Sequence, residues 1–239
     1  IRTTSLLAPQ SSTSTWYANA FTPLSTFVSK TDVRKTFGGT NWGNLGHAGG
    51  YTSYDYGAAI TEERQVHREK YSEAKLIANF VHASPALASA TAGYNTSGIY
   101  TDSKEITTTP LFSNKTNFYV TRQTRYNSLA STPYKLKVQT SAGNLTLPQL
   151  GGQLTINGRD SKVHVTDYDV GGFNLLYSTA EIFTWKKYGS RSIVVVYGGP
   201  NEQHELAVSK TSGATAVEGS GVKFANRNGN TILNWHTHA

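Results

Sequence analysis

Two groups of acidic residues in this chain have the side chains of a general acid and a general base. Glu62 and Glu63 are adjacent, and Asp167 and Asp169 flank Tyr168. Two carboxyl groups must converge on one bond to catalyse its cleavage, and side chains of adjacent residues rarely do so. Asp167 and Asp169 can share one strand face, but they lie beside turns, where aspartate usually caps the backbone or faces solvent. Neither pair predicts a mechanism.

Histidines and glutamates near the C-terminus have the side chains of a metal site. Glu202, His204 and Glu205 form one group, and His236 and His238 form another. Neither spacing matches a zincin motif, and no third ligand is evident. The chain has no cysteine, which excludes disulfides, cysteine nucleophiles and cysteine-ligated metals. We therefore predict no metal and no cofactor.

Two glycine-containing stretches also fall short of known catalytic or nucleotide-binding motifs. Residues 219–221 read Gly-Ser-Gly, whereas a nucleophile elbow needs Gly-x-Ser-x-Gly on a strand-to-helix turn. The glycines of residues 43–50 miss the dinucleotide fingerprint and follow no clear strand. The residues themselves thus predict no catalytic group.

Aromatic residues leave one non-catalytic function open. Trp185, Tyr188 and Tyr197 could stack on sugar rings, although aromatic residues in strands more often pack in a core. A non-catalytic carbohydrate-binding or structural β-module is therefore one of two functions that we consider.

Composition indicates a folded, β-rich and secreted protein. Of the 239 residues, 37% are hydrophobic and only 15% are charged, which is too apolar for a disordered chain. Three sequons, at Asn95, Asn114 and Asn144, are possible N-glycosylation sites and favour an extracellular location. The net charge is +7, but the basic residues are scattered, so we predict no nucleic-acid partner. No apolar run is long enough to span a membrane, so we predict no membrane partner. We also expect the protein to be a monomer.

The hydrophobic pattern predicts one helix followed by many short strands. The helix covers residues 69–83, where Leu76, Ile77, Phe80 and Val81 recur at helical spacing before Pro85. Turn residues then separate ten candidate strands, which are residues 117–122, 134–140, 153–157, 162–167, 173–177, 181–185, 192–197, 205–209, 222–225 and 231–235. Short strands at this spacing are typical of antiparallel sheets.

Several blocks, taken in order, resemble the large fungal β-galactosidases of glycoside hydrolase family 35. Three resemble the end of the catalytic barrel in that family: residues 36–43 (TFGGTNWG), 51–57 (YTSYDYG) and 68–71 (REKY). Five more resemble the second domain: residues 131–136 (STPYKL), 148–152 (PQLGG), 157–162 (NGRDSK), 177–181 (YSTAE) and 197–200 (YGGP).

The resemblance implies a mainly β fold: an antiparallel β-sandwich-like domain preceded by the last crossover and helix of a TIM barrel. It divides the chain into an unmatched, irregular segment at 1–35, the end of a (β/α)8 barrel at 36–84, and a β-rich second domain at 85–239 that is truncated at its C-terminus. We expect residues 1–35 to be unrelated to the family. The helix that ends near Ala83 would pack on barrel elements, so we expect its apolar face to lack a partner here.

The resemblance also implies the activity and its limits. Family members are secreted enzymes that remove terminal β-D-galactosyl groups with retention, which needs a nucleophile and an acid/base carboxyl group. Both are glutamates upstream of residue 36 in the family, so we predict that this chain is a fragment with no catalytic residue of its own and is inactive alone. One site residue carries over: Tyr56 matches the tyrosine that lines the galactose site.

Overall fold

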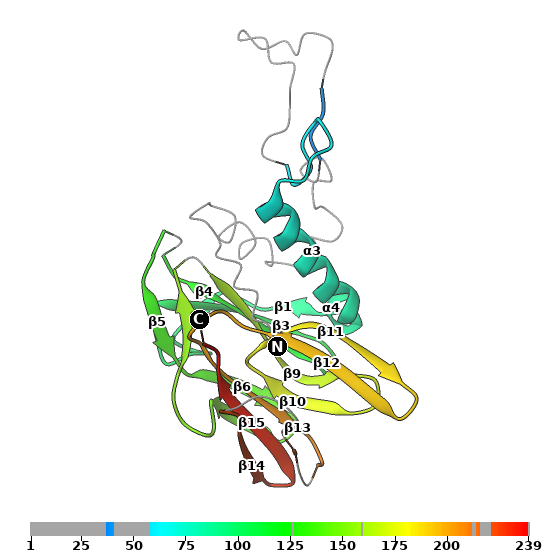
Figure 1. The fold of residues 1–239 in the computed structure, drawn as a ribbon. Helices are drawn as coiled ribbons and strands as arrows, with labels where there is room; N and C mark the ends of the chain where they lie inside the picture. Colours follow the sequence, from blue (N-terminus) through cyan, green and yellow to red (C-terminus); the bar gives the residue numbers. More distant parts are fainter. Residues whose placement is uncertain are drawn as a thin grey trace.

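The computed structural model describes residues 37–40, 58–125, 127–158, 160–211, 214–215 and 221–238. Within them lie two helices and fifteen strands, and the helices precede all the strands along the chain. Figure 1 shows the strands gathered in one β-rich body, with α3 standing against one side of it and extending away from it. No helix among the described residues is both long and apolar enough to cross a bilayer.

Helix α3 (Arg68–Ala83) confirms the helix predicted over residues 69–83. It ends before Ser84 because the proline that follows disfavours a helical conformation in the preceding residue. Pro85 then occupies the first turn of α4 (Pro85–Ala88), where its missing N–H has no intrahelical partner to lose.

The prediction that the apolar face of α3 lacks a partner is wrong. Ile77, Phe80 and Val81 pack against a core formed with the β strands. The rings of Phe80 and Phe118 meet edge to face, with centroids 6.1 Å apart. The helix is therefore held by the β-rich body itself.

A nine-stranded antiparallel sheet forms the centre of the molecule. Its strands follow the order β1-β3-β4-β9-β10-β13-β15-β14, and β2 pairs separately with β3. These strands are β1 (Thr91–Ala92), β2 (Thr96–Ser97), β3 (Ile106–Phe112), β4 (Asn117–Gln123), β9 (Ser161–Asp169), β10 (Asn174–Ser178), β13 (Gln203–Val208), β14 (Lys223–Arg227) and β15 (Asn230–His236).

Three two-stranded ribbons complete the fold (Figure 1). They are β11 (Glu181–Tyr188) with β12 (Arg191–Tyr197), β5 (Ser131–Tyr134) with β8 (Leu154–Asn157), and β6 (Leu136–Thr140) with β7 (Gly143–Leu147). The first ribbon shares a core with α3 and α4, and the other two share a second core. The result is the predicted mainly β, antiparallel, sandwich-like domain.

Alternation along the central strands separates the two cores. On β4, Phe118 and Val120 belong to the first core, whereas Tyr119 between them belongs to the second. Successive strand residues point to opposite faces, so one strand supplies both cores. On β9, Val165 belongs to the first core, while the neighbouring His164 side chain bonds to Tyr134, a residue of the second core.

The structure contains strands that the sequence pattern did not predict. β3 carries Pro110, which lacks a backbone donor and weakens a strand assignment. β1 pairs with residues 111–112 and β2 with residues 107–108, so the proline falls in the gap between these short partners. β7 was missed as well, because Gly143 and Asn144 read as turn residues.

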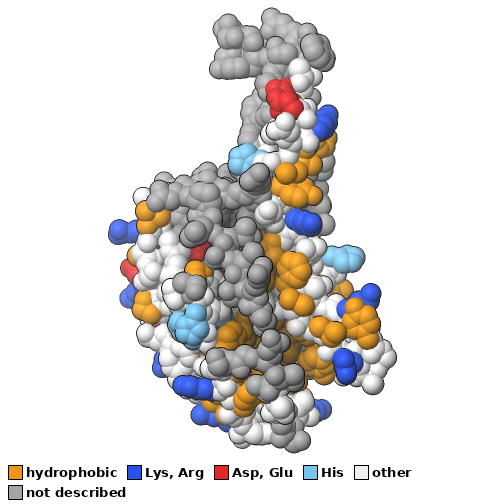
Figure 2. All heavy atoms as spheres, in the orientation of Figure 1, with side chains coloured by type: hydrophobic (Ala, Val, Ile, Leu, Met, Phe, Trp, Pro, Cys, Tyr) orange, Lys and Arg blue, Asp and Glu red, His pale blue; other side chains and the backbone are white. Residues whose placement is uncertain are grey.

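The β11–β12 ribbon also exposes apolar side chains on its outer side. Phe183, Tyr188, Ile193 and Val195 are all exposed, although Trp185, Val194 and Val196 of the same ribbon pack toward the first core. Figure 2 shows hydrophobic side chains over α3 and over this ribbon. Apolar patches of this kind are typical of contact surfaces between domains.

Candidate functional site

Glu202 is a buried carboxylate that ties three parts of the β-rich domain together. It lies directly before β13 and accepts a hydrogen bond from Lys162 Nζ on β9 at 2.9 Å. Gly199 N donates to it at 2.8 Å, and Asn157 Nδ2 at the end of β8 donates at 3.4 Å. Because its partners come from separate elements, the carboxylate fixes how these elements pack.

Lys162 remains charged inside the domain because two carboxylates face it. Its Nζ lies 2.9 Å from Glu202 Oε2 and 4.0 Å from Glu181 Oε2. Burial lowers the pKa of Lys162, but Glu181 and Glu202 oppose this effect and leave that pKa above its ordinary value. Burial raises the pKa of Glu181 to about 7, although Lys162 works against it. Both carboxylates thus act on the buried lysine, and Glu202 is the nearer of the two.

His204 packs beside this ion pair, under the turn formed by residues 197–200. Its Nε2 lies 3.5 Å from Glu202 Oε2, and its ring centroid is 5.6 Å from that of Trp235. Burial lowers the pKa of His204 to about 4, so the ring is neutral at pH 7. A Cβ atom at Gly198 would overlap the His204 ring, and one at Gly199 would lie 2.6 Å from Glu202 Oε1. The two glycines allow the backbone to pass directly over the buried charge.

Replacing Gly198 with alanine is therefore expected to destabilise the chain by about 2 kcal/mol, since the added methyl group cannot be placed without moving a packed histidine. Urea unfolding followed by fluorescence measures the difference. Ser190→Ala, an exposed turn position, is the control and should leave the midpoint unchanged. An unchanged midpoint for Gly198→Ala would show that the turn does not pack on His204.

A second buried carboxylate, Glu205 on β13, holds the loop of residues 148–152. It accepts hydrogen bonds from the backbone N–H groups of Gln149 at 2.5 Å and Leu150 at 2.9 Å. Tyr177 Oη donates at 2.8 Å and Asn234 Nδ2 at 3.1 Å. Four donors saturate the carboxylate, which is fully buried. Glu205 thus works as a structural acceptor.

His164 forms the third buried polar centre. Its Nδ1 lies 2.9 Å from the carbonyl oxygen of Thr179, so this nitrogen must carry the proton and donate. Nε2, 2.8 Å from Tyr134 Oη, then accepts from that hydroxyl. Burial lowers the pKa of His164 to about 3, which keeps the ring neutral.

These buried groups predict opposing effects of pH on stability. The histidines have folded pKa values below their ordinary 6.5, so they destabilise the fold as pH falls from 6.5 toward about 4 for His204 and about 3 for His164. Glu181 has a folded pKa of about 7 above its ordinary 4.5, so its contribution to stability is lost as pH rises through this window. Acidification from pH 7 to 5 therefore stabilises the fold through the protonation of Glu181. It destabilises the fold through the two histidines, which stay neutral when folded.

Glu181→Gln is expected to steepen the loss of stability between pH 7 and 5, by up to about 1.4 kcal/mol per pH unit, because it removes the opposing contribution. Urea unfolding at pH 7, 6 and 5 compares the variant with the parent chain. Parallel pH profiles would contradict the raised pKa of Glu181.

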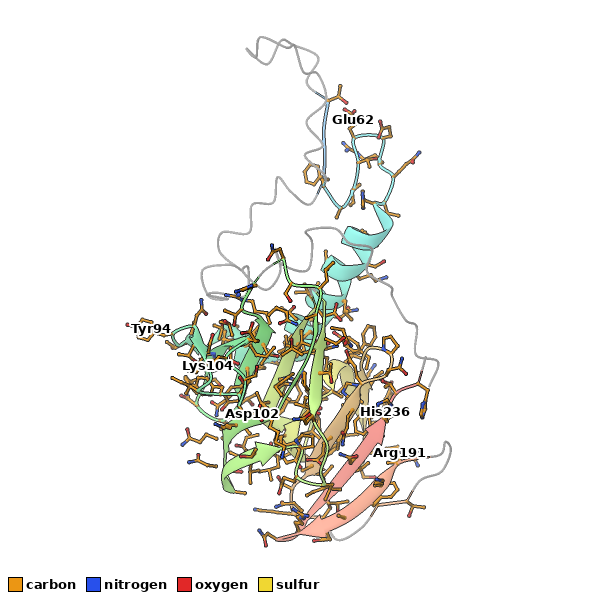
Figure 3. All side chains as sticks on the ribbon, turned by 90° about the vertical axis from the view of Figure 1, so that its left-hand side faces the viewer. Glu62, Tyr94, Asp102, Lys104, Arg191 and His236 are labelled. Carbon is orange, nitrogen blue, oxygen red and sulfur yellow. The ribbon has the colours of Figure 1, made fainter. Side chains whose placement is uncertain are left out.

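The two acidic pairs that the sequence offered, Glu62 with Glu63 and Asp167 with Asp169, lie in different parts of the structure. Glu62 accepts a hydrogen bond from Thr40 Oγ1 at 2.6 Å, and Figure 3 places it at the far end of α3, away from the β-rich body. Asp167 accepts from Ser141 N at 2.7 Å, and Asp169 accepts from Gly172 N at 3.1 Å. Both aspartates bond to turns, as the sequence indicated.

The other candidates from the sequence were the possible metal ligands, the aromatic residues and Tyr56. Within the described ranges no three histidine, cysteine or acidic side chains gather as a metal site would require. His236 and His238 lie ring to ring, with centroids 5.5 Å apart. Trp185 packs in the core and its Nε1 donates to Ala83 O at 2.7 Å, whereas Tyr188 is 55% exposed, so a core role for this tyrosine is wrong. Tyr56 and the glycines of residues 43–50 lie outside the described residues.

All three sequon asparagines lie on the surface. Asn95 precedes β2, Asn114 lies in the turn between β3 and β4, and Asn144 lies on β7, and each is exposed. Each side chain is therefore accessible to a glycan, and modification of these sites remains a prediction.

Sequence reasoning missed Lys162 and Glu181 as partners and treated Glu202 and Glu205 as possible metal ligands. The signal that could have found them is the set of family-like blocks. Residues 157–162 supply Lys162, residues 177–181 supply Glu181, and residues 148–152 and 197–200 supply backbone donors to the two buried glutamates. Four blocks that are far apart in the sequence thus meet in one network.

The fold and this network define the described part as an antiparallel β domain whose buried charges serve packing. Comparison with known families gives two matches: "Beta-galactosidase, domain 2" over residues 88–239 and "Glycosyl hydrolases family 35" over residues 10–81. The chain therefore belongs to the β-galactosidase domain 2 family, adjoined by a family 35 segment, as its resemblance implied. The second match includes most of residues 1–35, which the sequence analysis separated from the family.

Named relatives are β-galactosidases of filamentous fungi. The chain is 63% identical over 193 residues to the probable beta-galactosidase A of Neosartorya fischeri, covering 80% of this chain and 19% of the relative. It is 55% identical over 215 residues to beta-galactosidase A of Aspergillus oryzae, and the match covers 89% of this chain and 21% of the relative. It is 55% identical over 212 residues to probable beta-galactosidase E of Aspergillus fumigatus, and the match covers 87% of this chain and 21% of the relative. The chain thus spans about a fifth of the length of these relatives.

Proposed function

We propose that this chain is part of a secreted family 35 β-galactosidase, which hydrolyses terminal β-D-galactosyl residues with retention of configuration. The observation that carries the proposal is the agreement of two family matches, one on each side of the α3–α4 junction, with relatives of the same name. The described β domain then serves as a structural domain beside the catalytic barrel.

The chain alone is expected to be inactive on galactosides. A retaining glycosidase needs two carboxyl groups about 5–5.5 Å apart that both face the substrate. In the β domain, Glu202 and Glu205 are buried and bonded to structural donors, and Glu181 faces the buried Lys162. The family resemblance supports this expectation, because it implies catalytic glutamates that precede the stretch resembling residues 36–43, and residues 1–35 contain no glutamate.

Tyr56 is proposed to line the galactose site when the rest of the enzyme is present. A chimera tests this proposal: the matching region of the Aspergillus oryzae relative is replaced by this chain. We expect the chimera to hydrolyse o-nitrophenyl β-D-galactoside, and Tyr56→Phe in it to lower kcat/KM about ten-fold, as one lost hydrogen bond would.

Tyr94→Phe is the matched control for that variant, because Tyr94 is 91% exposed and lies on the side of the β-rich body in Figure 3. It should leave kcat/KM unchanged. A folded chimera without activity would refute the proposed function, whereas an active chimera that is indifferent to Tyr56→Phe would refute the role of this tyrosine alone.

A further inference from the structure

A cleft of about 840 Å³ opens beside the junction of α3 and α4. Its walls come from this junction, from the turn between β3 and β4, from the end of β6, from the facing ends of β9 and β10, and from Trp185 in the middle of β11. None of the buried carboxylates described above lines it, so the cleft is separate from the network around Lys162.

The walls of the cleft combine aromatic and amide groups. The polar atoms of Trp185 and Tyr168 are already used in hydrogen bonds to the helix junction. Trp185 Nε1 and Tyr168 Oη each donate to Ala83 O at 2.7 Å. The Trp185 ring therefore offers mainly carbon surface to the cleft, whereas Tyr168 is only 2% exposed and contributes little surface. Asn117 and Gln139 contribute amides, Asp167 and Asp169 contribute carboxylates, and the exposed Lys115 contributes an ammonium group that balances part of their charge. An aromatic surface with a few amide and carboxylate groups is suited to a neutral, hydroxyl-rich ligand such as a sugar.

One sequon asparagine belongs to this cleft. Asn114 lines it directly, together with Lys115 and Thr116 of the same sequon. The turn is held because Ser113 Oγ donates to Thr116 O at 2.7 Å, and Thr116 Oγ1 donates to Asp167 O on β9 at 2.9 Å. Asn95 and Asn144 are exposed as well but do not line the cleft. A sugar attached to Asn114 therefore starts at the wall of a site suited to sugars.

We propose that Asn114 carries an N-linked glycan and that the N-acetylglucosamine core of this glycan lies in the cleft, against Trp185. The occupant is thus covalently attached, and its tether keeps it at high effective concentration, so that weak contacts suffice to hold it. Bound in this way, the glycan joins the α3–α4 junction to the ends of the central strands.

The chain itself contains the controls for a test. The full chain is secreted from a yeast host and treated with endoglycosidase H, which cuts between the two core N-acetylglucosamines, and glycopeptide mass spectrometry follows each site. In the native chain we expect release at Asn114 to be at least about ten-fold slower than at Asn95 and Asn144, as it would be if the core were docked nine-tenths of the time. In the denatured chain all three sites should release at the same rate.

Equal release at the three sites of the native chain, or an Asn114 without a glycan, would overturn the proposal. Two variants show whether the Asn114 glycan is protected because it lies in the cleft or only because the turn between β3 and β4 blocks the endoglycosidase. Gln139→Trp fills the cleft from an exposed position, and Trp185→Leu removes the aromatic wall. Each should raise the release rate at Asn114 to that of the other two sites. Continued protection of Asn114 in a folded Gln139→Trp chain would also refute docking, even if Trp185→Leu fails to fold.

Discussion

Replacing Glu202 with glutamine is expected to lower the free energy of unfolding by about 3–5 kcal/mol, which is the range for breaking one side of a buried ion pair. The variant keeps the shape of the side chain but removes the carboxylate that lies 2.9 Å from the buried Lys162 ammonium, and the ion-pair partner that remains, Glu181, is 4.0 Å away. Urea unfolding of the full chain at pH 7 measures the loss.

Two comparisons show whether the ion pair causes this loss. Glu105→Gln changes an exposed glutamate to the same residue type and should cost less than about 0.5 kcal/mol. Adding Lys162→Met to Glu202→Gln should recover part of the stability, because it removes the unpaired buried charge. A loss for Glu202→Gln no larger than that of the Glu105 control would show that Lys162 is not neutralised by Glu202.

Glu205→Gln is expected to have the second-largest effect, a loss of about 3 kcal/mol, because hydrogen bonds to a charged acceptor are worth about 1.5–3 kcal/mol each. The glutamine amide would place N–H donors against donors that now point at the carboxylate, including Gln149 N and Tyr177 Oη. Hydrogen exchange gives a local readout. Amides of residues 149 and 150 should exchange faster, while those of β4 at the centre of the sheet should not.

Uniform exchange across the chain would mean that Glu205 stabilises the whole domain without holding the loop of residues 148–152 in particular. Unchanged exchange at both amides would contradict the two backbone hydrogen bonds. The Glu105→Gln chain again provides the reference, because that side chain is exposed.

Much of the fold follows from local pattern. The helix before Pro85 and the strands between glycine or asparagine turns were predicted because their periodicity is strong and their boundaries carry turn residues. β3 was not predicted, since Pro110 argues against a strand unless its missing donor falls between two short partners. That arrangement depends on tertiary pairing, which no local window contains.

The polar network could not be predicted from residue types for a related reason. Glu202, His204 and Glu205 resemble a ligand set in sequence, yet their partners come from β9, from the loop before β8 and from the turn before β13. Only the sheet order brings Lys162 beside Glu202. Resemblance to a family identified the right blocks without showing what they do, and the structure shows that four of them supply partners to buried charges.

The measurement that tests the central claim most directly is turnover of a chromogenic β-galactoside by the purified 239-residue chain. The buried carboxylates of the β domain serve packing, so we expect no turnover from the parent chain or from Tyr56→Phe. Turnover that Tyr56→Phe abolishes would contradict this account, since it would require an acid–base pair within the chain. Glu62, Glu63, Asp167 and Asp169 would then be the carboxylates to replace first.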